Sequence, residues 1–154
     1  MFIMLSVLAY LAVSKRPLFW WAILSLGVAL SSAAVVTYLD WTFIYRQRPF
    51  IVIPTDIPPS SQDIWRLSSS YPSGHARDTA LVTTLAAHFI PRLKIVAIFL
   101  SLFVAFSRVY VGAHYPTDVL AGLAIGYLSA KIGLIISRKL QLIKSKKKKD
   151  PSLP

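Results

Sequence analysis

The chain has 154 residues, of which 55% are hydrophobic, and its mean hydropathy is +0.59. An ordinary soluble domain is less hydrophobic, and the apolar residues form blocks long enough to cross a bilayer, so we expect an integral membrane protein. There is no cysteine, which excludes disulfides, thiolate metal sites and a catalytic thiol. The formal net charge of +11 could indicate nucleic-acid binding, but no nucleic-acid-binding module accompanies it.

Two apolar blocks open the chain. The first, residues 1–13, reaches only about 20 Å as a helix, which is short for a hydrocarbon core of about 30 Å. It is interpreted as a shortened span, a half-inserted helix or the core of a signal peptide, although no basic residue precedes it. The second, residues 18–39, is long enough to span, and aromatic residues flank both of its ends. Residues 50–71, rich in proline and serine, then predict a loop.

Three further helices are predicted after this loop. The first covers residues 73–90, with Ser73 as its N-cap and Pro91 as its stop signal. The others cover about residues 93–109 and 115–137, and each is largely apolar. Small residues on the last helix are expected to allow close helix packing. They are Gly122, Gly126, Ser129 and Gly133.

The expected fold class is therefore all-α, an integral membrane bundle of about five helices. Residues 1–143 would form this single domain, and the basic residues 144–154 would form a disordered tail. The loops at one side of the bundle, and the tail, are rich in lysine and arginine, which predicts that this side is cytoplasmic. In a plasma membrane, the 46–77 loop and the 108–118 turn would then face the extracytoplasmic side.

Phosphate-binding residues cluster in three places on that outer side. Arg48 and Arg108 can each clamp phosphate oxygens through two parallel hydrogen bonds. Ser73, with the backbone amides of Gly74 and His75, would open a helix, and helix N-termini bind anions. This combination predicts a site for a phosphoryl group.

Two histidines and one carboxylate complete the cluster. A neutral imidazole can attack phosphorus, and a second imidazole can exchange protons with the leaving group. Asp118, four residues after His114, can accept a hydrogen bond from one ring nitrogen and fix the tautomer. Two other interpretations stay open from the residues alone. His75, His114 and Asp118 could hold a metal, or Asp118 could simply stabilise a helix start.

Taken in order, Arg48-Pro49, Pro72-Ser73-Gly74-His75 and Ser107-Arg108 with His114 and Asp118 resemble the type-2 phosphatidic acid phosphatase superfamily. The signature of that family is Lys-x6-Arg-Pro, Pro-Ser-Gly-His and Ser-Arg-x5-His-x3-Asp. The resemblance covers about residues 41–130. It implies that His114 is the nucleophile and forms a phosphohistidine, and that His75 protonates the leaving oxygen and then activates water. It implies no metal and no other cofactor.

The chain departs from this signature at one position. Trp41 stands where the family has its first-segment lysine. We expect either that Arg46 or Arg77 compensates for the missing charge, or that the substrate needs one cation fewer.

The resemblance and the predicted sidedness favour a membrane enzyme that hydrolyses a lipid phosphate or diphosphate, with a polyisoprenyl (undecaprenyl or dolichyl) diphosphate as the first choice. Phosphatidic acid and phosphatidylglycerophosphate are the alternative substrates. A catalytically silent phospholipid-binding scaffold is the alternative of another class, supported only by Trp41. A vanadate-dependent peroxidase is disfavoured because the motifs adjoin spanning helices. The expected partners are the amphiphilic lipid and the bilayer, without nucleic acid.

Overall fold

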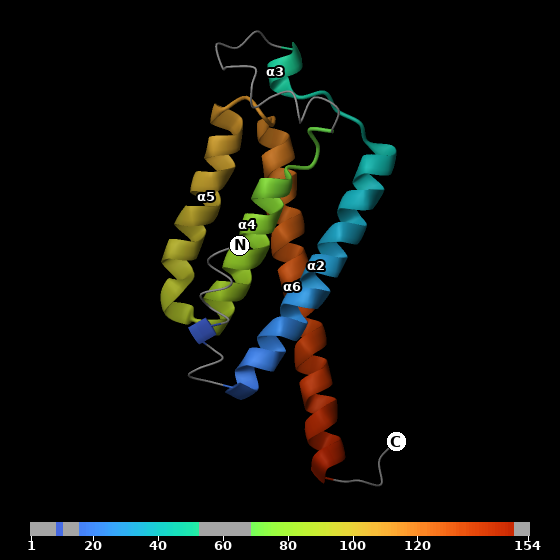
Figure 1. Ribbon diagram of the computed structural model, residues 1–154, viewed down its shortest axis with the longest axis vertical. Coiled ribbons are helices and arrows are strands. Elements are labelled where there is room, and N and C mark those ends of the chain that lie inside the picture. The colour runs from blue at the N-terminus through green and yellow to red at the C-terminus, as the bar shows by residue number, and fades with distance from the viewer. Residues whose placement is uncertain (1–8, 11–15, 53–68, 150–154) are drawn as a thin grey trace.

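A computed structural model describes residues 9–10, 16–52 and 69–149 of the chain (Figure 1). No β-strand occurs in these ranges, which confirms the predicted all-α class. Of the first apolar block, residues 1–13, only 9–10 are described. Of the loop predicted over residues 50–71, residues 53–68 lie outside the described part, and residues 50–52 belong to a short helix instead. The helices are α2 (Arg16–Phe43), α3 (Pro49–Val52), α4 (Gly74–Phe89), η3 (Pro91–Leu93), α5 (Lys94–Tyr110) and α6 (Pro116–Lys149).

Helix α4 lies at the centre of the bundle (Figure 1). It packs most extensively on α6 and next on α5, while α2 packs chiefly on α6. In contrast, α5 contacts α6 much less than it contacts α4. Helix α5 is therefore held mainly from one side.

The close packing of α6 depends on its glycines. A Cβ atom at Gly126 would collide with the backbone of Arg77 on α4, and one at Gly133 would collide with the backbone of Ser25 on α2. These contacts confirm the predicted packing role of the small residues. They also explain how α6 serves both α4 and α2 without large side chains between them.

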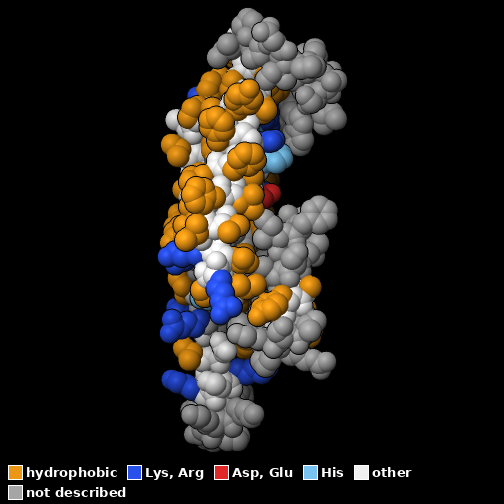
Figure 2. Space-filling model, turned by 90° about the vertical axis from the view of Figure 1, so that its left-hand side faces the viewer, with side chains coloured by type: hydrophobic (Ala, Val, Ile, Leu, Met, Phe, Trp, Pro, Cys, Tyr) orange, Lys and Arg blue, Asp and Glu red, His pale blue; other side chains and the backbone are white. Residues whose placement is uncertain are grey.

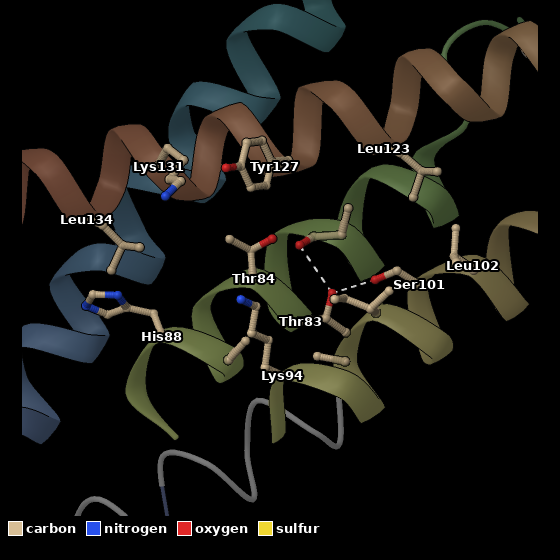
Figure 3. Close-up of a pocket in the computed structure, with 14 residues that line it drawn as sticks. Thr83, Thr84, His88, Lys94, Ser101, Leu102, Leu123, Tyr127, Lys131 and Leu134 are labelled. Atoms are coloured by element: carbon tan, nitrogen blue, oxygen red, sulfur yellow. Dashed lines mark hydrogen bonds between the residues drawn. The ribbon is translucent and has the colours of Figure 1, made fainter. Parts of the chain in front are cut away.

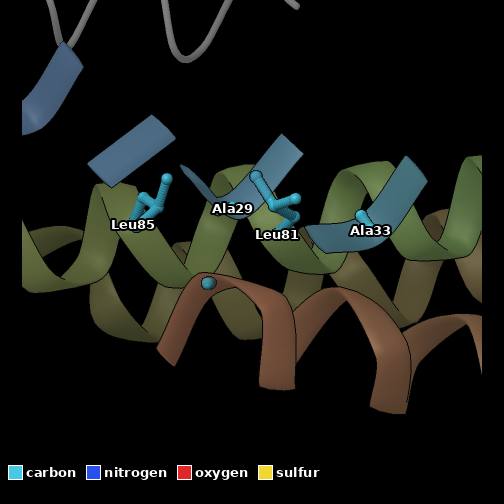
Figure 4. Packing of buried hydrophobic residues seen from close by; sticks show 5 residues of the cluster. Ala29, Ala33, Leu81 and Leu85 are labelled. Carbon is cyan, nitrogen blue, oxygen red and sulfur yellow. The ribbon is translucent and has the colours of Figure 1, made fainter. Parts of the chain in front are cut away.

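The core between these helices is built from small and medium-sized side chains (Figure 4). Leu81 and Leu85 on α4 fill the space left by Ala29 and Ala33 on α2 and by Ala130 on α6. All five are at most 2% exposed. Alternating large and small residues allows the helices to interdigitate without voids.

Within the described part of the chain, three helices are long and apolar enough to cross a membrane, namely Phe19–Asp40, Pro91–Tyr110 and Pro116–Lys146. Large apolar side chains cover much of the outer surface, while lysines and arginines gather toward the end where α6 terminates (Figure 2). On α5, for example, Phe99, Phe103 and Phe106 are each exposed by about two thirds. An apolar surface of this extent suits contact with lipid.

One prediction about a helix end was wrong, and another is confirmed only in position. Helix α6 continues to Lys149, beyond both the predicted end near residue 137 and the predicted start of a disordered tail at 144. Lysine and leucine are good helix formers, and no glycine or proline interrupts residues 134–149, so nothing stops the helix. At the start of α4, Ser73 occupies the predicted N-cap position, but its side chain forms no capping hydrogen bond.

Candidate active site

Three segments meet at one end of the bundle, and we call them together the polar rim: residues 46–50, 69–75 and 108–118. Backbone hydrogen bonds join them pairwise. The Ser70 N–H donates to the Arg46 carbonyl (2.7 Å), and the Phe50 N–H donates to the Gly112 carbonyl (3.2 Å). The Ser73 N–H donates to the Asp118 carbonyl (3.0 Å). The rim is therefore a cross-linked unit and not three independent loops.

His114 lies at the centre of the polar rim and is only 5% exposed. Its Nδ1 lies 2.7 Å from the Ser70 carbonyl oxygen, and its Nε2 lies 3.2 Å from Nη1 of Arg48. Because a carbonyl oxygen can only accept, Nδ1 must carry the proton and donate it. Nε2 then holds a lone pair, which accepts from Arg48. The hydrogen-bond network thus assigns the tautomer that a nucleophilic Nε2 requires.

The charge state of His114 suits the same role. The pKa of His114 is lowered to about 4, chiefly by burial and also by the positive charge of Arg48, against the opposing effect of the Ser70 hydrogen bond. The imidazole is consequently neutral at pH 7. A neutral ring is the form that can attack an electrophile.

Asp118 is completely buried, and its carboxylate accepts three hydrogen bonds. Oδ2 accepts from the Ser70 hydroxyl (2.6 Å) and from the Tyr115 N–H (3.0 Å), while Oδ1 accepts from Arg46 (2.8 Å). The hydrogen bond predicted between Asp118 and His114 is replaced. Ser70 lies between them instead. Its carbonyl oxygen accepts the hydrogen bond from Nδ1–H of His114, and its hydroxyl donates to Asp118.

Arg48 is nearly buried, at 6% exposed. Besides His114, its guanidinium donates to the carbonyl oxygens of Ala113 (3.1 Å) and Ser69 (3.3 Å). These acceptors fix the plane of the guanidinium beside Nε2 of His114. Burial lowers the pKa of Arg48 and the carboxylate of Asp118 opposes that effect, but an arginine stays protonated at neutral pH.

The two arginines expected to compensate for the missing lysine behave differently. Arg46 lies in the polar rim, where it pairs with Asp118, donates to Thr117 (2.7 Å) and lies 3.8 Å from the centre of the Tyr115 ring. Arg77 instead pairs with Asp78 (2.7 Å) and donates to Thr37 on α2. The side chain of Trp41 lies outside the described part of the chain. Of the two candidates, only Arg46 is joined to rim residues through its side chain among the described contacts.

Ser73 is fully buried, and its hydroxyl has no hydrogen-bond partner among the described residues. Leaving a buried hydroxyl unsatisfied costs about 1–3 kcal/mol, a cost that an anion placed beside it would remove. The position also adjoins the N-terminus of α4, where the amides of Gly74 and His75 point outward from the helix. This unsatisfied donor suits an anionic ligand.

His75 and Arg108 complete the cluster. Burial lowers the pKa of His75, and the positive charges of Arg108 and Arg48 lower it further, so both guanidinium groups act on this ring. Nε of Arg108 donates to the neighbouring Ser107 hydroxyl (3.2 Å). Helix α5 thus presents Arg108 from its last turn, opposite the first turn of α4.

Ser69 and Ser70 belong to the serine-rich segment that predicts a loop, yet both lie in the polar rim. The Ser69 hydroxyl accepts from the Arg46 N–H (3.2 Å), and Ser70 joins His114 to Asp118. The only signal in the sequence was the serine run directly before the Pro-Ser-Gly-His segment. The interpretation of His75, His114 and Asp118 as metal ligands gains no support, since no suitable group of three ligands occurs among the described residues.

The geometry agrees with a comparison of the chain with known families. The family model described as PAP2 superfamily matches residues 20–141. The chain belongs to the PAP2 superfamily. This is the family that the three motifs resemble, and the match extends over α2, α4, α5 and most of α6.

Curated PAP2 relatives carry phosphatase names. The chain is 30% identical to the undecaprenyl-diphosphatase BcrC of Bacillus subtilis over 79% of its own length and 60% of that protein. It is 36% identical to an undecaprenyl-diphosphatase of Sulfolobus acidocaldarius over 71% of its length and 54% of that protein. A lipid A 1-phosphatase of Rhizobium johnstonii is 37% identical over 45% of this chain and 29% of that protein. The chain thus spans less than two thirds of these relatives. No solved structure matches it.

Proposed function

We propose that this PAP2 protein hydrolyses the phosphate or diphosphate group of a membrane lipid through a phosphohistidine on His114. One observation carries the proposal. Nε2 of His114 holds a lone pair beside the buried Arg48, whose guanidinium is held by two backbone carbonyls, while Nδ1–H is fixed on the Ser70 carbonyl. A structural histidine has no need for this combination of a fixed tautomer and a neighbouring cation.

In the first step, the phosphoryl group would lie between Arg48, Arg108 and the start of α4. The two guanidinium groups and the Ser73 hydroxyl would bind its equatorial oxygens, where charge is greatest in the transition state. The Arg48 N–H shifts from Nε2 of His114 to a phosphate oxygen, which frees the Nε2 lone pair. Nε2 then attacks phosphorus, and the bond from phosphorus to the leaving oxygen breaks. His75 donates its proton to that oxygen, so the lipid leaves as a neutral alcohol or as a lipid phosphate.

In the second step, the now neutral His75 takes a proton from water, and the resulting hydroxide attacks the phosphohistidine. Phosphate departs, and His114 returns to its neutral form with the proton still on Nδ1. The Ser70 carbonyl stabilises the positive imidazolium while the intermediate exists. Asp118 contributes by fixing Ser70, and Arg46 contributes by fixing Asp118.

The proposed substrate is a polyisoprenyl diphosphate on the extracytoplasmic side. Two of the relatives are named undecaprenyl-diphosphatases. The sidedness rests on charge, because the basic end of α6 lies opposite the polar rim and lysine-rich ends tend to remain in the cytoplasm (Figure 2). Phosphatidic acid and phosphatidylglycerophosphate are the alternatives, and a relative from Bacillus subtilis is named phosphatidylglycerophosphatase B.

The test of the reaction is to trap its intermediate. The purified chain is mixed briefly with a polyprenyl diphosphate that carries ³²P in its terminal (β) phosphate, and the reaction is quenched in alkali. The protein should then carry an acid-labile, alkali-stable label. The His114→Ala variant should carry none and should release no phosphate from any lipid. A silent scaffold would bind the lipid without either result, and labelling that survives in His114→Ala would refute the nucleophile.

The choice of substrate needs a second measurement. Initial rates on a panel of polyprenyl diphosphate, polyprenyl phosphate, phosphatidic acid and phosphatidylglycerophosphate, in the same detergent, should be highest for the first. EDTA should leave these rates unchanged because the proposed charge stabilisation comes from arginine. A higher kcat/KM for a glycerophospholipid would reassign the substrate while leaving the reaction itself intact.

A further inference from the structure

A second concave site lies away from the polar rim, between α4, α5 and α6 (Figure 3). Its volume is about 560 Å³, within the range of small-molecule binding sites. The cavity exists because α5 packs on α4 but contacts α6 only weakly. None of the motif residues of the polar rim lines it.

Basic groups from three different helices face this cavity. They are His88 on α4, Lys94 at the start of α5 and Lys131 on α6 (Figure 3). Among the described residues that line the cavity none is acidic, and neither lysine forms an ion pair within the described part of the chain. Nζ of Lys131 lies 5.5 Å from the centre of the Tyr127 ring, a weak contact at that distance. We call this site the basic cavity.

The three groups lie at one depth in the bundle. At about 1.5 Å per residue, His88 lies about 21 Å along α4 from its start at the polar rim. By the same measure, Lys131 lies about 22 Å along α6 from Pro116, and Lys94 lies about 24 Å along α5 from Tyr110. With a hydrocarbon core of about 30 Å, long lysine side chains at this depth reach the headgroups of the opposite leaflet.

The basic lining residues are concentrated at one end of the cavity, where Leu134 also lies (Figure 3). The basic groups gather at the end away from the polar rim, whereas Leu102 and Leu123 line the end toward it (Figure 3). On the outside, the neighbouring Ile95 and Phe99 of α5 are about two thirds exposed and form part of the apolar, lipid-facing surface. A ligand that reaches the cavity from the bilayer would therefore present a charged end to the lysines and an apolar chain to the leucines.

We propose that the basic cavity binds an anionic phospholipid of the leaflet opposite the polar rim. Its phosphate would lie among Lys94, Lys131 and His88, with the Thr84 hydroxyl as an additional donor. One acyl chain would lie along Leu102 and Leu123, in the gap that α5 leaves against α6. The lipid would complete the α5–α6 contact and so steady α5, whose last turn carries Arg108 at the polar rim.

The proposal is tested on the purified full chain, delipidated in a non-ionic detergent. Native mass spectrometry would measure binding of phosphatidylglycerol and of phosphatidylcholine with identical acyl chains. Phosphatidylglycerol is a phosphodiester, so the proposed phosphatase reaction does not consume it. Phosphatidylglycerol should bind at least about tenfold more tightly than phosphatidylcholine. Its headgroup carries a net negative charge that attracts both lysines, whereas the headgroup of phosphatidylcholine has no net charge.

The variant Lys94→Gln/Lys131→Gln should lose about tenfold or more in phosphatidylglycerol affinity and should lose the preference over phosphatidylcholine. Arg138→Gln/Lys139→Gln is the matched control, because it removes the same charge from exposed positions of α6 outside the cavity, and it should bind like the native chain. The single variants Lys94→Gln and Lys131→Gln should each lose part of the affinity, which keeps the test valid if the double variant does not fold.

Three results would overturn the proposal. The first is equal affinity for the two lipids, which would make the cavity merely apolar. The second is equal loss in the cavity variant and the control, which would reduce the effect to general surface charge. The third is displacement of the lipid by millimolar inorganic phosphate, which would identify a free anion as the ligand. These measurements do not depend on the outcome of the phosphohistidine experiment.

Discussion

The polar rim and the basic cavity both collect cationic groups, but they hold them differently. In the polar rim, Arg46 and Arg48 each have two or more hydrogen-bond acceptors, and His114 is fixed through both ring nitrogens. In the basic cavity, Lys94 and Lys131 are exposed and form no ion pair among the described residues. A covalent reaction requires side chains in a fixed geometry. Binding a mobile lipid headgroup requires only opposite charge at the depth of that headgroup in the bilayer.

The same contrast separates Arg46 from Arg77. These are the two arginines expected to compensate for the missing lysine, and both form an ion pair with an aspartate. The partner of Arg46 is fully buried and bound to Ser70, while the partner of Arg77 is more than half exposed. Ion pairs at exposed carboxylates contribute little, so only the first pair is expected to matter for the reaction.

The strongest test of this contrast is the Asp118→Asn variant. The amide cannot accept from Ser70, Tyr115 and Arg46 together, so the 69–73 segment loses its anchor and His114 loses a fixed partner for Nδ1. We expect kcat on a polyprenyl diphosphate to fall at least about a hundredfold.

Asp78→Asn is the control for that variant, because Asp78 also pairs with an arginine but is exposed on α4. It should keep activity within about threefold. Circular dichroism would establish that both variants fold. An Asp118→Asn enzyme with near-native kcat would show that Ser70 is held in place without the carboxylate.

The next largest effect is expected for Arg46→Gln. If Arg46 positions Asp118, kcat should fall about tenfold while KM changes little, because the lost contact is not with the substrate. Arg46→Lys should recover part of the loss, since a lysine can still pair with Asp118. Arg77→Gln should leave both constants within about threefold.

A different division of the effect between kcat and KM would indicate another role for Arg46. A large rise in KM with unchanged kcat would mean that Arg46 binds the phosphate directly, as a substitute for the lysine that Trp41 replaces. The KM and kcat of these three variants, measured on one substrate, distinguish positioning from binding.

A smaller effect concerns pH. His114 must be neutral to attack, and its pKa is lowered to about 4, so the acid flank of kcat/KM should lie near pH 4. His75 must be protonated to donate, and burial with Arg108 and Arg48 lowers its pKa below the ordinary value of 6.5. The free enzyme should therefore be most active between these values, on the acid side of neutrality.

The same shifts affect stability with a defined sign. The unfolded chain protonates His114 near pH 6.5, whereas the folded chain resists protonation until about pH 4, so the unfolded state binds more protons in between. The contribution of His114 to the stability of the fold is complete above pH 6.5 and is lost as the pH falls toward 4.

The activity prediction is checked by measuring kcat/KM from pH 3.5 to 9. An optimum above pH 7.5 would contradict the assignment of the two histidines.

The helices could be predicted from the sequence to within a few residues, because apolar blocks and proline stops mark spanning helices strongly. The end of α6 could not, since a lysine-rich stretch is compatible both with a solvated tail and with a helix. The candidate site residues could be predicted because phosphoryl transfer requires particular side chains. The role of Ser70 could not, because it contributes a carbonyl group that every residue possesses.

The basic cavity was equally invisible in the sequence. His88, Lys94 and Lys131 come from three helices, and their common depth depends on where each helix begins and ends. Taken singly in the sequence, His88 and Lys131 are isolated polar residues in apolar segments, and neither indicates a shared site. Only the weak α5–α6 contact, a property of the packed bundle, brings them to one cavity.

The smallest effect on activity is expected for a buried polar pair outside both sites. The Ser25 and Ser137 hydroxyls lie 2.7 Å apart between α2 and α6, and Ser25 also lies 2.7 Å from the Trp21 carbonyl. Because that second partner remains, Ser137→Ala should cost only about 1 kcal/mol of unfolding free energy. It should leave kcat/KM and the pH optimum unchanged, because neither serine touches the rim or the cavity.

A melting curve in detergent and one rate measurement suffice for this variant. If Ser137→Ala lowered kcat tenfold while the bundle stayed folded, packing between α2 and α6 would be coupled to the polar rim. The two ends of the molecule would then not be separable, and the loss of activity in any rim variant would need a stability correction before it could be assigned to chemistry. Unchanged kinetics with a lower melting temperature would instead establish that the polar groups here stabilise the helices, whereas those of the rim hold His114 in place.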